Sequence, residues 1–115
     1  AKHIAVATYI DEDGWKVYEL NGPIFFGSVS NFKELFSPND DPNDVVIEFK
    51  NARVSDSSAI EALHGLAYKY QKLGKKLHLR HLSEDCLQLL DDAARYVEIN
   101  INEDPRYKVA TDVFD

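Results

Sequence analysis

A short apolar segment in the middle of the chain sets the strongest limit on the fold. Val45 to Phe49 is nearly all apolar and β-branched, and it follows a polar, proline-containing stretch, Ser37 to Asp44, that we interpret as a solvated loop. Such a run is typical of a strand that is buried on both faces of a sheet. We therefore place Val45 to Phe49 at the centre of a sheet that is covered on both sides.

Helical and extended periods alternate after this strand. Four apolar residues have the spacing of one buried helical face: Ile60, Leu63, Ala67 and Tyr70. Gly74 is suited to end this helix, and a strand follows through 75–81. Beyond it we expect a helix over 83–94, a strand over 97–101 and a short helix over 106–113. Strands that alternate with helices predict partly parallel pairing.

The first part of the chain predicts a hairpin. Residues 4–10 alternate as in a half-buried strand, and Asp13-Gly14 is a strong turn signal. In the next strand Trp15, Val17 and Glu19 share one face, while Lys16, Tyr18 and Leu20 share the other. Asn21-Gly22-Pro23 is expected to end that strand. A short strand or extended segment at 24–26 and a helix over 29–36 are expected next.

These elements predict one α/β domain over 1–115, with a mixed sheet of four to five strands and packed helices. The core is expected at about 4–101, followed by a tail or short helix at 102–115. Hydrophobic residues make up 44% and charged residues 29% of the chain, as in a soluble globular protein. No apolar run approaches the ~20 residues of a membrane-spanning helix, so we expect no direct membrane insertion. The net charge of -7 disfavours nucleic acid as a partner.

The segment between the central strand and the main helix is the most informative one for function. Asp56, Ser57 and Ser58 stand where the carboxyl end of a strand meets the start of a helix, a position that favours ligand contact and an added phosphate. Ser58 and Glu61 also fit a capping box, so Ser58 has a purely structural alternative. Ser57 would then lie just outside the helix as the better candidate for modification.

Other candidate sites have weaker support. His78 and His81 are three apart on an expected strand and point to opposite faces, so we interpret them as surface histidines and expect no metal site. Lys72, Lys75, Lys76 and Arg80 form a basic cluster, which leaves nucleotide binding open although no glycine-rich phosphate loop is present. No cofactor is otherwise expected. No serine has a recognisable base and oxyanion hole, so we expect no enzyme activity.

The run Gly22-Pro23-Ile24-Phe25-Phe26-Gly27-Ser28 suggests a contact surface. Phe25 and Phe26 are adjacent and cannot both point inward from a strand. An exposed phenylalanine beside Gly27 and Ser28 would suit docking of a partner.

A strand, a loop ending in Asp56-Ser57-Ser58 and an amphipathic helix closed by Gly74-Lys75-Lys76 together resemble the STAS fold, from about Val6 to Ile101. That family includes anti-sigma factor antagonists and the C-terminal domains of SulP sulfate and anion transporters. In the antagonists, the serine directly after the loop aspartate is phosphorylated by a partner kinase. The resemblance places Ser57 at that position.

Two positions separate these branches. Antagonists usually carry glycine after the two serines, where this chain has Ala59, and an aspartate near the position of Phe25. The run from Gly22 to Ser28 is similar to the transporter STAS domains. The resemblance therefore implies a non-catalytic, cytoplasmic regulatory domain of a SulP-type transporter, with the transmembrane domain in cis and possible regulatory proteins or kinases as partners. A stand-alone antagonist switched at Ser57 and a nucleotide-binding regulator remain the alternatives.

Overall fold

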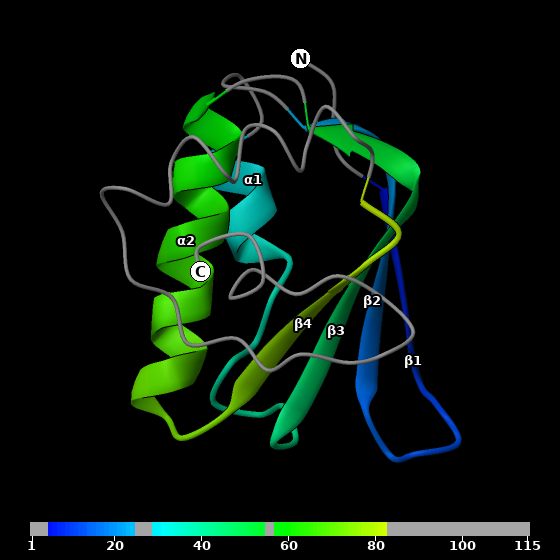
Figure 1. Ribbon diagram of the computed structural model, residues 1–115, viewed down its shortest axis with the longest axis vertical. Coiled ribbons are helices and arrows are strands. Elements are labelled where there is room, and N and C mark those ends of the chain that lie inside the picture. The colour runs from blue at the N-terminus through cyan, green and yellow to red at the C-terminus, as the bar shows by residue number, and fades with distance from the viewer. Residues whose placement is uncertain (1–4, 25–28, 55–56, 83–115) are drawn as a thin grey trace.

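A four-stranded sheet and two helices make up the described part of the chain, residues 5–24, 29–54 and 57–82 of a computed structural model (Figure 1). In chain order the elements are β1 (Ala5–Ile10), β2 (Lys16–Ile24), α1 (Val29–Glu34), β3 (Asp44–Val54), α2 (Ser57–Lys72) and β4 (Lys76–Arg80). Within these ranges, no helix is long and apolar enough to cross a membrane.

The strands lie side by side in chain order, β1-β2-β3-β4. β1 and β2 are antiparallel, whereas β2 pairs with β3, and β3 with β4, in parallel. Each parallel step is bridged by a helix, as parallel strands require: α1 joins β2 to β3, and α2 joins β3 to β4. The predicted α/β fold with a mixed sheet is confirmed.

The helix-facing side of the sheet carries the main hydrophobic core. α1 and α2 lie on the same side of the strands (Figure 1), and Phe32 of α1 and Tyr70 of α2 belong to one buried cluster with Val45 and Ile47 of β3. Val46 lies between Val45 and Ile47 in β3, on the other face of the sheet, and it is also fully buried. The prediction that β3 is covered on both sides is therefore confirmed.

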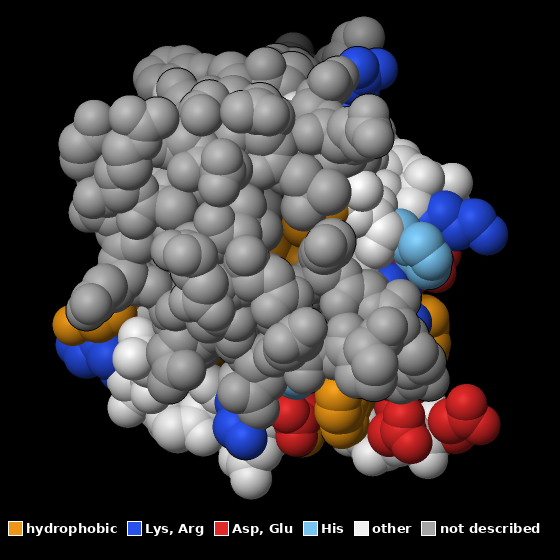
Figure 2. Space-filling view, in the orientation of Figure 1, with side chains coloured by type: hydrophobic (Ala, Val, Ile, Leu, Met, Phe, Trp, Pro, Cys, Tyr) orange, Lys and Arg blue, Asp and Glu red, His pale blue; other side chains and the backbone are white. Residues whose placement is uncertain are grey.

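The β1–β2 hairpin is closed by Asp11 and Gly14. The Asp11 amide donates to the Trp15 carbonyl at 2.9 Å, and the Asp11 carboxylate accepts from the amides of Asp13 and Trp15. Gly14 has a φ of 83°, which glycine adopts without steric cost. Acidic side chains gather over this end of the sheet in the space-filling view (Figure 2).

The second strand is longer than the sequence predicted. Asn21-Gly22-Pro23 does not end β2, which continues to Ile24. A register shift between Glu19 and Asn21 introduces a bulge, and Gly22 adopts a φ of 102° beyond it. The bulge lets β2 pass the turn-forming residues and stay paired with β3. A separate strand or extended segment was expected to begin at residue 24. That start is wrong, because Ile24 is the last residue of β2.

The main helix has the predicted face and the predicted end. Ile60, Leu63, Ala67 and Tyr70 are all buried. Gly74 follows the helix with a φ of 73°, and the amide of Lys75 donates to the Tyr70 carbonyl at 2.9 Å. This arrangement satisfies a carbonyl that the helix itself leaves unpaired.

The elements expected over 83–94, 97–101 and 106–113 lie outside the described residues. The division into a core at 4–101 and a tail at 102–115 therefore stays a prediction.

Candidate functional site

The candidate site starts at the carboxyl edge of two neighbouring strands. Ile24 at the end of β2 is the register partner of Val54 at the end of β3. Because these strands are parallel, the segments that follow them leave the sheet from the same edge, where ligands of open α/β sheets are usually bound. Phe25, Phe26, Gly27, Ser28 and Asp56, which the sequence placed in this site, lie outside the described residues.

Two serines open the helix at this edge. α2 begins at Ser57, so both serines stand in its first turn. The capping-box alternative, in which Ser58 precedes the helix and Ser57 lies outside it, does not agree with this helix start. Ser58 is half-buried, and the next residues, Ala59 and Ile60, are buried in the core. The first turn of α2 therefore packs against the sheet. Ser57 is the first residue of that turn.

The electrostatics of this helix start suit an anion. The first amides of a helix have no partner within it, and the helix dipole is positive at this end. α2 has no acidic residue in its first turn, but Asp56 directly precedes it in the sequence and its carboxylate would repel an added phosphate. The phospho-acceptor role of Ser57 and the contact role of Ser58 stay predictions.

A second polar centre lies at the other end of the sheet, and sequence reasoning missed it. Asp41 is only 5% exposed, although it belongs to the loop that was expected to be solvated. Its Oδ2 accepts hydrogen bonds from the hydroxyls of Tyr18 and Tyr70, both at 2.6 Å, and its Oδ1 accepts from the Lys16 ammonium at 3.2 Å. The carboxylate thus joins β2 and α2 to the loop before β3.

The acid–base properties of these partners follow from that contact. Burial raises the pKa of Tyr70 far above its ordinary value, and the hydrogen bond to Asp41 raises it further. The pKa of Tyr18 is raised by burial and by the same carboxylate. Burial would lower the pKa of Lys16, but the hydrogen bond to Asp41 and the nearby negative charge outweigh it, and the pKa is raised. Both phenols therefore stay protonated donors, and the lysine stays cationic.

Lys75 completes this anchorage of the loop. Its ammonium donates to the backbone carbonyls of Pro38, Asn39 and Asp41. The one sequence signal for the centre was the pair Tyr18 and Tyr70 on buried faces, since a buried phenol needs a hydrogen-bond partner. Nothing in the sequence told Asp41 apart from Asp40 as that partner.

The predicted basic cluster is divided among different contacts. Lys75 holds the loop carbonyls, whereas the Arg80 guanidinium lies 3.9 Å from Asp11 and 3.8 Å from Glu48. The Lys72 ammonium lies 5.5 Å from the centre of the Tyr68 ring. The sequence cluster is therefore no single phosphate site, and nucleotide binding stays a prediction.

The two histidines of the last described strand have different environments. His78 is 2% exposed, stacks on Trp15 with ring centroids 4.3 Å apart, and contacts Asp44 at 3.0 Å. The prediction of a surface position is wrong for His78, because the opposite face of the sheet is also covered. His81 follows the strand with a φ of 58° and contacts Glu48 at 2.8 Å. The described residues contain no cluster of three or more side chains suited to a metal.

His64 is another buried titratable group. It is 4% exposed in the middle of α2, and burial lowers its pKa to about 4. The imidazole is therefore neutral at physiological pH, and it lies in the packed part of the helix instead of on the surface where a substrate could meet it.

Fold and comparisons agree on the class of protein. A STAS domain family model matches residues 6–105, and the chain belongs to the STAS domain family. The structure is similar to the STAS domain of an antisigma-factor antagonist from Rhodobacter sphaeroides, with a TM-score of 0.60 and 26% identity over 66% of this chain and 84% of that one.

Two further similarities involve transporters. The STAS domain of a SulP transporter from Vibrio cholerae has a TM-score of 0.52 and 23% identity, over 69% of this chain and 62% of that one, and it supports the fold alone. The "Putative sulfate transporter YbaR" of Bacillus subtilis (strain 168) is 26% identical over 91 residues. That alignment covers 79% of this chain and 19% of the relative, so the chain spans about a fifth of the relative's length.

Proposed function

We propose that this chain is the non-catalytic regulatory domain of a SulP-type sulfate or anion transporter, on the cytoplasmic side of the membrane. The observation that carries the proposal is the alignment of 79% of the chain with a small part of a sulfate transporter relative. Transport itself would belong to a transmembrane domain in cis. The STAS domain would act on it through contacts with that domain or with other proteins.

A stand-alone antagonist is the second candidate. It is favoured by the similarity to the Rhodobacter antagonist, of which this chain covers 84%. In that reading, Ser57 at the start of α2 would be the phosphorylated residue, and the dianionic phosphate would disturb or create a partner contact at the sheet edge. Ala59 and Phe25 depart from the usual antagonist sequence and disfavour this candidate.

Fractionation of native cells separates the two candidates. An antibody raised against the 13.1 kDa domain should detect a polypeptide several times larger, in the membrane fraction. A band near 13 kDa in the soluble fraction would contradict the transporter proposal and support the antagonist.

Phosphorylation is tested separately by mass spectrometry of the native protein. The transporter proposal does not require phosphate on Ser57, whereas the antagonist does. Phosphate on Ser57 that varies with growth conditions would favour the antagonist switch. An unmodified Ser57 in every condition would remove that candidate.

A further inference from the structure

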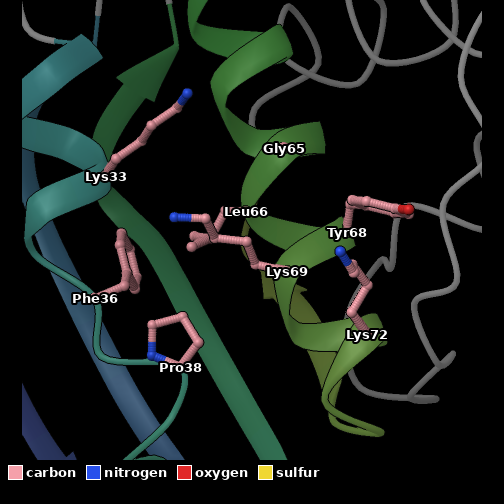
Figure 3. Close-up of a pocket in the computed structure, with 8 residues that line it drawn as sticks. All are labelled: Lys33, Phe36, Pro38, Gly65, Leu66, Tyr68, Lys69 and Lys72. Carbon is pink, nitrogen blue, oxygen red and sulfur yellow. The ribbon is translucent and has the colours of Figure 1, made fainter.

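A hollow of about 330 Å³ lies between α1 and the second half of α2. Lys33 and Phe36 line it from the α1 side, and Leu66 and Lys69 line it from α2 (Figure 3). A second hollow of about 280 Å³ shares Pro38, Lys69 and Lys72 with the first and extends to Leu73. Together they form one trough, which we call the lysine groove.

The charge of the lysine groove is opposite to that of the whole chain. Lys33, Lys69 and Lys72 contribute three ammonium groups, and none of the described lining residues is acidic. The complete chain carries a net charge of -7. A positive surface on an acidic protein attracts an anionic partner to that one place, while the negative charge on the rest of the protein repels it.

Exposed apolar side chains flank these lysines. Tyr68 is 56% exposed and Leu73 is 44% exposed, and they are two of the four large hydrophobic side chains exposed among the described residues. Tyr68 and Lys72 lie side by side on α2, while Lys69 extends toward Phe36 (Figure 3). Figure 2 also shows cationic and hydrophobic side chains together at the left edge, over α2. The groove therefore offers both cationic and apolar contacts.

The length of the groove fits a helical segment. One wall runs from Gly65, through the end of α2, to Leu73, which is about 12 Å or two helical turns at 1.5 Å per residue. Hydrophobic grooves between helices commonly receive one amphipathic helix of a partner.

We propose that the lysine groove binds an acidic amphipathic helix of a protein partner. The carboxylates of that helix would pair with Lys33, Lys69 and Lys72, and its apolar side chains would contact Tyr68 and Leu73. The inference deepens the proposed regulatory function, on which it rests, by naming the surface and the chemistry of the partner.

An anionic bilayer suits the same surface less well. Three lysines give only a weak attraction to an anionic membrane, and the remaining negative charge of the chain would be repelled. The groove is also concave, whereas a membrane surface is broad and flat.

Binding is tested with a fluorescein-labelled peptide of about 15 residues, long enough for a marginal helix, with glutamates on one helical face and leucines on the other. A scrambled peptide of the same composition and a lysine-for-glutamate peptide are the controls. Fluorescence anisotropy should show binding of the first peptide only, and it should weaken with salt. In ¹⁵N NMR spectra, the largest shifts should map to Tyr68, Lys69 and Lys72.

A matched pair of variants locates the effect. Lys69→Glu with Lys72→Glu should weaken peptide binding by about 10-fold or more, because attraction becomes like-charge repulsion. Lys50→Glu with Lys76→Glu changes the net charge equally at two exposed lysines of β3 and β4, and it should change binding less than about 2-fold. Circular dichroism of both variants checks that the fold is kept.

Three outcomes would overturn the inference: equal losses in the two double variants, NMR shifts away from the groove, or binding to phosphatidylserine vesicles with no binding of the acidic peptide. Each can occur with the native protein still in the membrane fraction, so failure of this inference is distinguishable from failure of the proposed function.

Discussion

Asp41 shows how one residue can organise the end of this sheet. A buried carboxylate is costly unless hydrogen bonds and a positive charge compensate it. Here two tyrosine hydroxyls and Lys16 supply that compensation, and the partners come from β2 and α2. The loop before β3 is thereby fixed, and with it the start of the central strand.

Asp41→Ala should lower the free energy of unfolding by about 2–4 kcal/mol, because it leaves two buried phenols and a lysine without their shared acceptor. Urea unfolding at pH 7 measures this change. Asp40→Ala, at the exposed neighbouring residue, is the control and should change stability by less than about 0.5 kcal/mol. Equal effects of the two substitutions would show that the Asp41 network contributes little.

His64 should make stability depend on pH. Burial lowers its pKa from 6.5 to about 4 in the fold, so the unfolded chain takes up a proton between these values and the folded chain does not. This contribution is present above pH 6.5 and is lost as the pH falls toward 4. Between pH 7 and pH 5 the loss should be about 2 kcal/mol.

His64→Leu removes that titration and should flatten the stability profile between pH 7 and pH 5. An NMR titration of the wild-type His64 ring should give a midpoint near the lowered pKa of about 4. A midpoint near 6.5, or the same pH profile in both proteins, would contradict the buried neutral imidazole.

At the scale of elements, one glycine within α2 and one just after it have opposite requirements. Gly74 ends the helix with a φ of 73°, whereas Gly65 lies within the helix with open space where a Cβ would stand. Glycine is needed at the first position and is unfavourable at the second.

Gly74→Ala should therefore destabilise the protein by about 1 kcal/mol, because an alanine is strained in the left-handed conformation. Gly65→Ala should stabilise it by about 0.5–1 kcal/mol through higher helix propensity. Thermal unfolding of the two variants measures both signs. A destabilising Gly65→Ala would mean that the helix surface there is more crowded than the structure describes.

The sequence predicted the helices and strands well where one local pattern of apolar or turn-forming residues was clear. The stripe of α2 could be inferred from its spacing, the hairpin from the Asp13-Gly14 turn signal, and the buried strand β3 from its apolar, β-branched run. The end of β2 could not, because Asn21-Gly22-Pro23 is a local turn signal that the paired strand β3 overrides through a bulge. His78 was placed wrongly for a related reason: alternation gives the face of a strand and says nothing of what covers that face.

Much of the site could not be predicted from the sequence, because it depends on contacts between residues that are far apart in the chain. Asp41 binds Tyr18 and Tyr70, which are 23 and 29 positions away from it in the sequence. The lysine groove is lined by residues from α1 and α2, which β3 separates in the sequence. Neither has a local sequence pattern. Ser57 and Ser58 could be singled out because their strand, loop and helix are consecutive, although α2 begins at Ser57, earlier than a cap at Ser58 would allow.

For the whole molecule, the mixed sheet and the family match define a STAS domain, and the relatives include both a transporter and an antagonist. The domain offers a helix start suited to an anion at one sheet edge and a lysine groove along α2. Both features are suited to contact with other molecules or domains.

Sulfate uptake tests the central claim most directly. The native polypeptide that contains this domain, and the same polypeptide lacking it, should be compared for radiolabelled sulfate uptake per amount of protein in the membrane. If the proposed function is right, uptake should fall several-fold without the domain, while the transmembrane domain proposed in cis is still present in the membrane. Unchanged uptake would contradict a regulatory role of this domain in transport.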